Sequence, residues 1–162
     1  MNKFLFLCLG ISLFINCQSK PIENFSEQAL NDILIQTNGD QISFKNILQK
    51  HKGKTVFIDI WASWCKDCRK ALPSLQLLQE QHPNTSYVFL SLDRSKNAWK
   101  KAIDKYNIKG DHYFMSSGWK GPLGQFLDLD WIPRYMMIDP ESKILVYNAI
   151  KTTDKNLLNQ LK

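Results

Sequence analysis

The hydrophobic positions of this chain follow two kinds of spacing, one typical of buried strands and one typical of amphipathic helices. From Thr55 to Trp61 the residues are apolar almost without a break, and Asp59 is the charged exception. Such a run predicts a central strand that is covered on both faces. From Cys65 the apolar residues follow helical spacing until His82-Pro83, which predicts a helix that contains Pro73. The chain therefore passes from a buried strand almost directly into a long helix.

The same two patterns recur further along the chain. A strand over 87–92 and a helix over 96–106 come next, and Ala98, Ala102, Ile103 and Tyr106 are expected on the buried side of that helix. Alternating strands and helices argue for an α/β architecture with parallel pairing. The other expected elements are a hairpin of strands 31–36 and 41–44 around Asn38-Gly39, a helix over 45–51, a short helix opened by Pro122, a second hairpin of strands 135–138 and 144–147, and a closing helix over 154–161.

The first residues have the layout of an export signal. Lys3 precedes an apolar run over 4–15, which is too short to span a bilayer, so we expect residues 1–16 to be a signal peptide. The run ends before Cys17 and a polar stretch, which resembles a bacterial lipoprotein processing site with Cys17 as the lipidated residue. We therefore expect a lipidated tether over 17–30 and a folded domain over 31–162. Ordinary secretion with a free Cys17 is the alternative.

Length and charge exclude some classes of function. The 162 residues, 44% of them hydrophobic, suit one domain with a short leader. The net charge of +6 comes from 21 basic and 15 acidic residues that are scattered along the chain. Because there is no dense basic stripe, we expect no nucleic-acid binding; a solvated basic surface explains the charge, and attraction to anionic lipids or acidic partners is the alternative. We expect a monomer.

Cysteine usage points to redox chemistry. Cys8 leaves with the leader and Cys17 is taken by lipid, so Cys65 and Cys68 remain in the folded part. A bridge across so short a loop removes little entropy from the unfolded chain, which makes a purely structural role a poor explanation.

The position of Cys65 suits disulfide exchange. At the start of a helix its pKa should fall below the free value, because the helix N-terminus favours the thiolate. Cys68, one turn further on, can resolve a mixed disulfide. Lys66 would stabilise the thiolate and Asp67 would oppose it.

Two further positions fit this chemistry. Asp59 lies within an apolar strand, so burial should raise its pKa and let it take the proton of Cys68 during exchange. An ion pair with a lysine such as Lys54 is the alternative. Pro133, just before an apolar strand, marks either a strand start or a cis turn.

The run from Val56 to Cys68, with Pro73 and the later Ile132-Pro133, resembles the thioredoxin superfamily. More narrowly it resembles the TlpA/ResA-like thiol-disulfide oxidoreductases of the bacterial envelope, including Bacteroidetes-type lipoproteins, over residues 31–162. The resemblance implies a thioredoxin-like α/β fold with a central mixed sheet flanked by helices, an N-terminal β-hairpin and a central insertion over 97–130.

The resemblance also implies roles for individual residues. Cys65 would be the exposed nucleophile, Cys68 the buried resolving cysteine and Asp59 the buried acid/base. Trp64 would be a packing and recognition residue, and a cis Pro133 would leave the Ile132 backbone free to pair with a substrate strand. The dipeptide Lys66-Asp67 differs from the Glu-Pro or other proline-containing dipeptides common in the family, which leaves the redox direction open.

The implied setting is the periplasmic side of the cell envelope. Disulfide-containing envelope proteins would be the substrates, and an integral-membrane thiol carrier would supply electrons. No cofactor is expected beyond the Cys65–Cys68 pair.

Two other classes of function remain as alternatives. A copper or zinc carrier would use both thiolates with His51, His82 or His112, none of which lies at motif spacing. A non-catalytic binding module with this fold would not need the cysteine pair. Trp61, Trp99, Trp119 and Trp131 are expected in core or groove packing.

Overall fold

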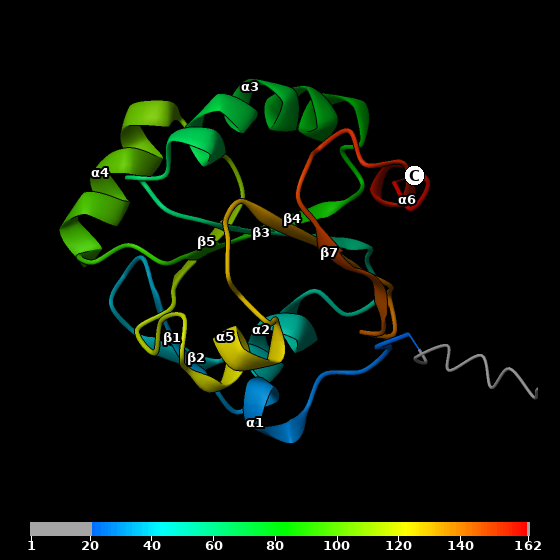
Figure 1. Cartoon of the computed structure of the whole chain (residues 1–162), viewed down its shortest axis with the longest axis horizontal. Coiled ribbons are helices and arrows are strands. Elements are labelled where there is room, and N and C mark those ends of the chain that lie inside the picture. The colour runs from blue at the N-terminus through cyan, green and yellow to red at the C-terminus, as the bar shows by residue number, and fades with distance from the viewer. Residues whose placement is uncertain (1–20, 162) are drawn as a thin grey trace, which may run out of the picture.

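The computed structural model describes residues 21–161, which form a seven-stranded sheet with helices on both faces (Figure 1). The expected signal peptide over 1–16 and Cys17 lie outside the described residues. In chain order the elements are α1 (Glu27–Leu30), β1 (Ile33–Gln36), β2 (Gln41–Ser43), α2 (Phe44–Lys50), β3 (Val56–Trp61), α3 (Lys66–Gln81), β4 (Ser86–Ser91), α4 (Lys96–Tyr106), β5 (Asp111–Phe114), α5 (Pro122–Phe126), β6 (Arg134–Ile138), β7 (Ile144–Ala149) and α6 (Lys155–Leu158).

The sheet is mixed, with the order β2-β1-β5-β4-β3-β6-β7. Its centre consists of the parallel strands β3, β4 and β5, and every other pairing is antiparallel. All six residues of β3 are buried, as the apolar run predicts for a strand with a neighbour on each side and helices over both faces. This confirms the expected central mixed sheet and the N-terminal hairpin.

The helices form two layers. In Figure 1, α3 and α4 lie above the sheet, while α1, α2 and α5 lie below it. Both crossovers from β3 to β4 and from β4 to β5 join adjacent parallel strands, so their helices cover the same face. The long helix α3 buries Cys68, Leu72, Leu75 and Leu78, which share one side of the helix. The first turn of α3 is thereby fixed against the sheet.

The buried side of α4 differs from the expected one. Trp99 and Ala102 are buried, with Ile103 and Tyr106 partly buried, whereas Ala98 is exposed. Trp99, Ala102, Ile103 and Tyr106 have the spacing of one helix face, and the large Trp99 side chain occupies the core in place of Ala98.

The resemblance implies a strand and a helix within the insertion over 97–130, and the structure shows how that strand pairs; it also shows a shorter closing helix than expected. Strand β5 lies within the segment expected as an insertion and pairs with both β4 and β1, which places the N-terminal hairpin in the main sheet. The closing helix α6 covers Lys155–Leu158, with Asp154 as its N-cap, and is shorter than the expected 154–161.

The folded domain begins before residue 31, so the boundary expected for the tether is wrong. The Phe25 ring packs against Phe44 and Phe126 at centroid distances of 4.9 and 5.2 Å, and Ala29 is fully buried. The Glu23 carbonyl accepts a hydrogen bond from the Ile144 N–H at 2.8 Å. These apolar and backbone contacts attach residues 23–29 to the folded domain, although the polar composition of this segment predicted a tether outside the core.

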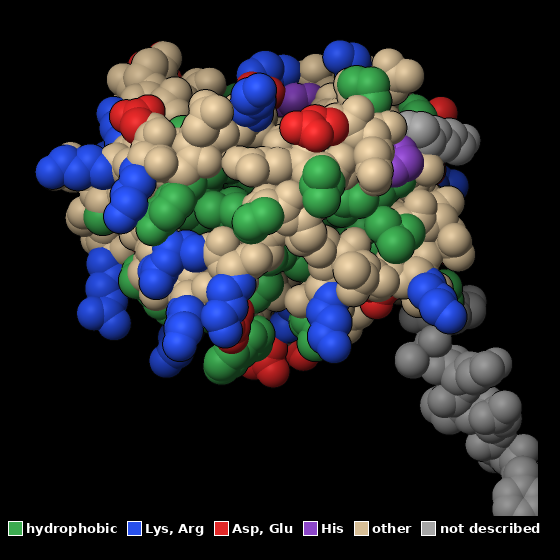
Figure 2. All heavy atoms as spheres, turned by 90° about the horizontal axis from the view of Figure 1, so that it is seen from above, with side chains coloured by type: hydrophobic (Ala, Val, Ile, Leu, Met, Phe, Trp, Pro, Cys, Tyr) green, Lys and Arg blue, Asp and Glu red, His purple; other side chains and the backbone are tan. Residues whose placement is uncertain are grey.

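The surface above α3 and α4 is rich in cations. Figure 2 shows lysine and arginine side chains spread over this face, with exposed hydrophobic side chains between them.

Among residues 21–161, no helix has the length and apolar character needed to cross a bilayer.

Candidate active site

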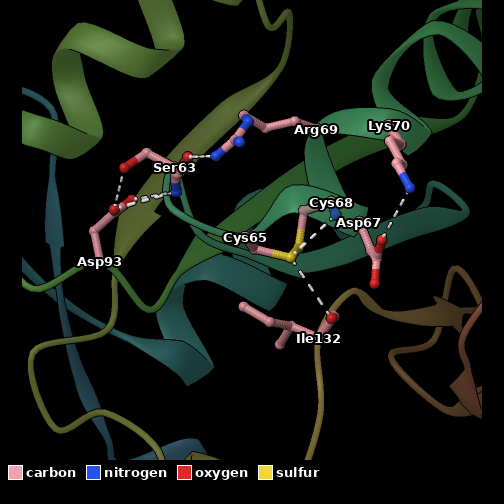
Figure 3. Close-up of a disulfide and its surroundings, with 8 residues drawn as sticks. All are labelled: Ser63, Cys65, Asp67, Cys68, Arg69, Lys70, Asp93 and Ile132. Atoms are coloured by element: carbon pink, nitrogen blue, oxygen red, sulfur yellow. Dashed lines mark hydrogen bonds and ion pairs between the residues drawn. A yellow bond between two sulfur atoms is a disulfide. The ribbon is translucent and has the colours of Figure 1, made fainter.

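The two cysteines of the folded domain lie at the start of α3, directly after the loop that leaves β3. Cys65 is the N-cap residue of α3 and forms a disulfide bond with Cys68, with 5.3 Å between their Cα atoms (Figure 3). The Cys68 N–H points at the Cys65 Sγ, with an N···S distance of 3.0 Å. When the disulfide is reduced, this N–H and the helix dipole stabilise negative charge on the Cys65 sulfur. The arrangement favours Cys65 as the attacking thiolate.

Access to the sulfur atoms is narrower than the resemblance implies. Cys65, expected as an exposed nucleophile, is 6% exposed, and Cys68 is 3% exposed. Cys65 nevertheless lines an open groove with Trp64 and Ile132. The expectation of an exposed Cys65 is therefore wrong: the residue is almost fully buried, and its access to solvent is through the groove.

A cis peptide bond joins Ile132 to Pro133, beside the disulfide. The Ile132 carbonyl oxygen lies 3.6 Å from the Cys65 Sγ, as Figure 3 shows. This is a van der Waals contact, because a disulfide sulfur carries no hydrogen to donate. Among residues 21–161, neither the N–H nor the carbonyl of Ile132 has a backbone hydrogen-bond partner. The chain thus presents one unpaired peptide edge next to the reactive sulfur atoms.

Asp59 is buried on the side of the sheet that α3 covers. Phe57 and Asp59 lie on the same face of β3, because side chains two residues apart in a strand point the same way. The ring centroids of Phe57 and Tyr87 are 5.5 Å apart. The Tyr87 hydroxyl in turn donates to the Leu78 carbonyl of α3 at 3.0 Å. Asp59 and the buried Cys68 therefore face the same layer between sheet and helix.

Burial changes the protonation of Asp59. Its side chain is 3% exposed, and loss of solvent raises its pKa to about 8. Its Oδ1 has no hydrogen-bond partner, and no ion pair with Lys54 occurs among residues 21–161. The lysine-paired alternative is therefore wrong, and near neutral pH this carboxyl is mostly protonated.

Tyr135 lies directly across from Asp59 on β6, so the two side chains share one face of the sheet. Burial, followed by the nearby Asp59 carboxylate, raises the pKa of Tyr135. Near neutral pH, Tyr135 is therefore neutral and Asp59 is mostly neutral, which limits uncompensated buried charge in this layer.

A hydrogen-bond network braces the loop before Cys65, and its central residue was not identified from the sequence. The buried Asp93 carboxylate accepts from the Ser63 N–H at 3.1 Å, from the Ser63 hydroxyl, and from the Ser91 hydroxyl at 2.8 Å. Arg69 of α3 donates to the Ser63 carbonyl at 2.7 Å, which Figure 3 shows together with Asp93. The signal available in the sequence was an aspartate directly after a second buried strand, since neighbouring parallel strands end at the same edge of a sheet.

Two grooves flank the disulfide. The aromatic groove, about 370 Å³, is lined by Trp64, Cys65, Lys66, Trp119, Trp131 and Ile132, among others. The second groove, about 420 Å³, lies on the Pro133 side and includes Lys70, Trp131, Tyr135, Ile150 and Lys151. Of the tryptophans, Trp61 and Trp99 are fully buried core residues, whereas Trp64 and Trp131 are 49% and 59% exposed.

The histidines are not arranged as ligands of a metal carrier. His51 contacts Asp111 at 3.1 Å, and His112 contacts the Ile108 carbonyl at 2.9 Å. In the part of the chain that the structure describes, no three His, Cys, Asp or Glu side chains are grouped as they would be to hold a metal ion.

Comparison with known proteins gives consistent matches. Residues 53–144 match a family model described as Thioredoxin-like. The chain is 34% identical to the thioredoxin-like protein YneN of Bacillus subtilis over 103 residues, which cover 61% of this chain and 59% of YneN. It is 24% identical to the thiol-disulfide oxidoreductase ResA of Bacillus cereus over 157 residues, which cover 95% of this chain and 87% of ResA.

Solved structures also match over nearly the whole domain. A solution structure from Bacteroides vulgatus, of a protein assigned to the thiol-disulfide oxidoreductases, superposes with a TM-score of 0.66 at 27% identity. The superposition covers 90% of this chain and 89% of that one.

Proposed function

Because this chain belongs to the thioredoxin-like family, we propose that it is a thiol-disulfide oxidoreductase that reduces disulfides in proteins outside the cytoplasm. The observation that carries the proposal is the Cys65–Cys68 disulfide at the start of α3, beside the unpaired Ile132 backbone. The activity in the names of the ResA relative and the Bacteroides vulgatus structure supports the same reaction class.

The proposed reaction proceeds in two exchange steps. The Cys65 thiolate attacks one sulfur of the substrate disulfide, which forms a mixed disulfide and releases the first substrate thiolate. Cys68 then loses its proton to the Asp59 carboxylate and attacks the Cys65 Sγ, which releases the second substrate thiolate and forms the Cys65–Cys68 disulfide. Two electrons pass to the substrate, and both released thiolates take up protons. A dithiol partner, for which we propose a membrane thiol carrier, returns two electrons and two protons to this protein, without a further cofactor.

Substrate positioning is assigned to the loop around Pro133. An extended substrate segment would pair with the free N–H and carbonyl of Ile132, which adds a short strand beside the sulfur atoms. Trp64, which lines the aromatic groove, would cover one side of that segment.

The charges beside Cys65 act in opposite senses, because Lys66 stabilises the thiolate and Asp67 opposes it. Strong stabilisation of the thiolate makes a protein of this kind an oxidant, because it stabilises the reduced form. The Asp67 carboxylate lies between the two cysteines in the sequence, and its negative charge disfavours the thiolate. Lys70 lies 3.7 Å from this carboxylate, but an exposed ion pair of this kind neutralises the effect of the Asp67 charge only weakly.

Redox equilibration tests the direction. When the purified chain is equilibrated with glutathione buffers, we expect a potential closer to about −270 mV, as in reducing members of the superfamily, than to about −120 mV, as in strongly oxidising ones. The fraction of oxidised protein is read by mass after thiol alkylation. A potential near the oxidising value would overturn the reductase assignment and leave the exchange chemistry in place.

For localisation, we propose that the chain is exported and anchored to the membrane by lipid on Cys17, with its active site on the periplasmic side. The apolar run over 4–15 and the polar residues after Cys17 support this proposal. In a bacterial host, we expect the unchanged chain in the membrane fraction and Cys17→Ser in the soluble extracytoplasmic fraction or unprocessed, as immunoblotting of the fractions would show. Cys8→Ser is the matched control, since that cysteine lies within the leader. Soluble, processed wild-type protein would contradict anchoring.

A further inference from the structure

The surface around the disulfide differs on its two sides. Trp64, Trp119 and Trp131 surround the aromatic groove on the Ile132 side. The second groove, on the Pro133 side, is lined by Lys70, Lys151 and the exposed Ile150, among others. Trp131 borders both grooves, so a segment lying across Cys65 would contact both sides at once.

The aromatic groove is an unusual feature for a protein surface. Trp64 is 49% exposed and Trp131 is 59% exposed, although tryptophan has a large apolar area that folding normally buries. Exposed tryptophans beside a reactive atom are typical of sites where a partner covers them, and tryptophan is enriched among the residues that dominate binding. The groove therefore fits an aromatic or large aliphatic side chain of the substrate.

The second groove has an excess of positive charge. Asp67, its acidic member, is already paired with Lys70 at 3.7 Å. Among residues 21–161, Lys151 has no ion-pair partner, and neither does Lys66 on the aromatic side. Cations also predominate over acidic side chains on the face drawn in Figure 2. A carboxylate on the substrate would complement Lys151, whereas a lysine there would be repelled.

We propose that the substrate is an extended cysteine-containing segment with an apolar side chain on one side of its cysteine and an acidic side chain on the other. The apolar side chain lies between Trp64, Trp119 and Trp131, and the acidic one lies beside Lys151. This inference rests on the proposed function, because the segment is defined by the disulfide that it brings to Cys65.

Short peptides test the substrate class. Each probe is a blocked peptide with one cysteine joined by a disulfide to 2-mercaptoethanol, an uncharged thiol. The peptides carry tryptophan on one side of the cysteine and glutamate or lysine on the other, in both orders, and a further set replaces tryptophan by serine. The reduced whole chain, in a mild detergent, is assayed for kcat/KM on each peptide, and insulin reduction is measured in parallel.

We expect roughly tenfold higher kcat/KM for glutamate than for lysine peptides in one of the two orders, and a smaller ratio at high salt because exposed charges are screened. Lys151→Glu should bring the ratio to about one or below it, whereas Lys101→Glu, the same charge change on the exposed side of α4, should keep it. Trp131→Ala should remove the preference for tryptophan over serine peptides, while Leu77→Ala, at a comparably exposed apolar residue of α3, should keep it.

The outcomes separate the two proposals. Equal kcat/KM for glutamate and lysine peptides, with insulin still reduced, would overturn the substrate class and leave the proposed function standing. If Lys151→Glu left the ratio of kcat/KM between glutamate and lysine peptides unchanged, the role of the second groove would likewise be overturned. If no peptide and no insulin disulfide were reduced, the proposed function itself would be lost.

Discussion

Replacing Cys65 by serine is expected to abolish disulfide reduction, with insulin turnover at least about 1,000-fold below that of the unchanged chain. A serine hydroxyl is not ionised near neutral pH and does not attack disulfide sulfur, so no mixed disulfide forms. The change removes the Cys65–Cys68 disulfide but leaves the length and backbone of α3 unaltered. The assay follows insulin precipitation with dithiothreitol as electron donor.

Cys68→Ser is the matched variant, because it removes the same disulfide and spares the attacking thiolate. We expect this variant to accumulate a mixed disulfide with its substrate, which mass spectrometry of the unreduced protein would detect at Cys65. Adduct formation in Cys68→Ser but not in Cys65→Ser would assign the attacking sulfur. Comparable turnover by Cys65→Ser and the unchanged chain would exclude Cys65 as the nucleophile.

Asp59→Asn is expected to slow the resolving step by on the order of 100-fold, the usual contribution of a proton-transferring side chain. In the unchanged chain only ionised Asp59 can accept the Cys68 proton, and its pKa of about 8 makes the ionised form a minority at pH 7. The rate of the resolving step should therefore rise with pH until about 8 and then level off. The rate of the asparagine variant should not show this rise. Rapid mixing of the reduced protein with a peptide disulfide over pH 6–9 measures it. An unchanged pH profile in Asp59→Asn would remove Asp59 from the mechanism.

The same substitution has an opposite effect on stability. The folded state holds the Asp59 proton up to pH about 8, whereas an unfolded chain releases it near pH 4, so between these values the folded state binds more protons. Stability from this group is therefore present at low pH and is lost as pH rises towards 8. A neutral amide in place of the carboxyl removes this loss. On going from pH 5 to pH 8, the free energy of unfolding of Asp59→Asn should therefore rise by about 3.5 kcal/mol relative to that of the unchanged chain.

Urea unfolding of the oxidised proteins at the two pH values measures this difference. Asp104→Asn, at an exposed aspartate of α4, is the control and should follow the unchanged chain. Parallel pH dependence of the unchanged chain and Asp59→Asn would show that Asp59 is not held protonated in the fold.

Local sequence patterns predicted the elements that carry the cysteines. The continuous apolar run of β3 requires burial on both faces, and the change to helical spacing places Cys65 at the helix start. The conflict between a charged Asp59 and its apolar neighbours likewise predicted a raised pKa without knowledge of its surroundings. These features depend on residues within one or two adjacent elements, and so they can be read along the chain.

Other features depend on which elements lie side by side. Residue 132 meets Cys65 because β6 pairs with β3, and Asp93 braces Ser63 because β4 ends beside β3. The packing of Phe25, and the burial of Trp99 where Ala98 had been expected, were likewise decided by the shape of the core.

By itself, the sequence determined a redox-active cysteine pair at the start of a helix, a buried acid in the preceding strand and an α/β domain that holds both. The family resemblance already implied a cis Pro133 at the site, whereas only the tertiary structure decided the rest of what surrounds that pair: the brace from Asp93 and a groove in which Trp119 and Trp131 meet Trp64. The physical reason is that secondary structure and burial follow from short-range periodicity, whereas a site made by several loops depends on strand order, which the cooperative packing of the whole core selects.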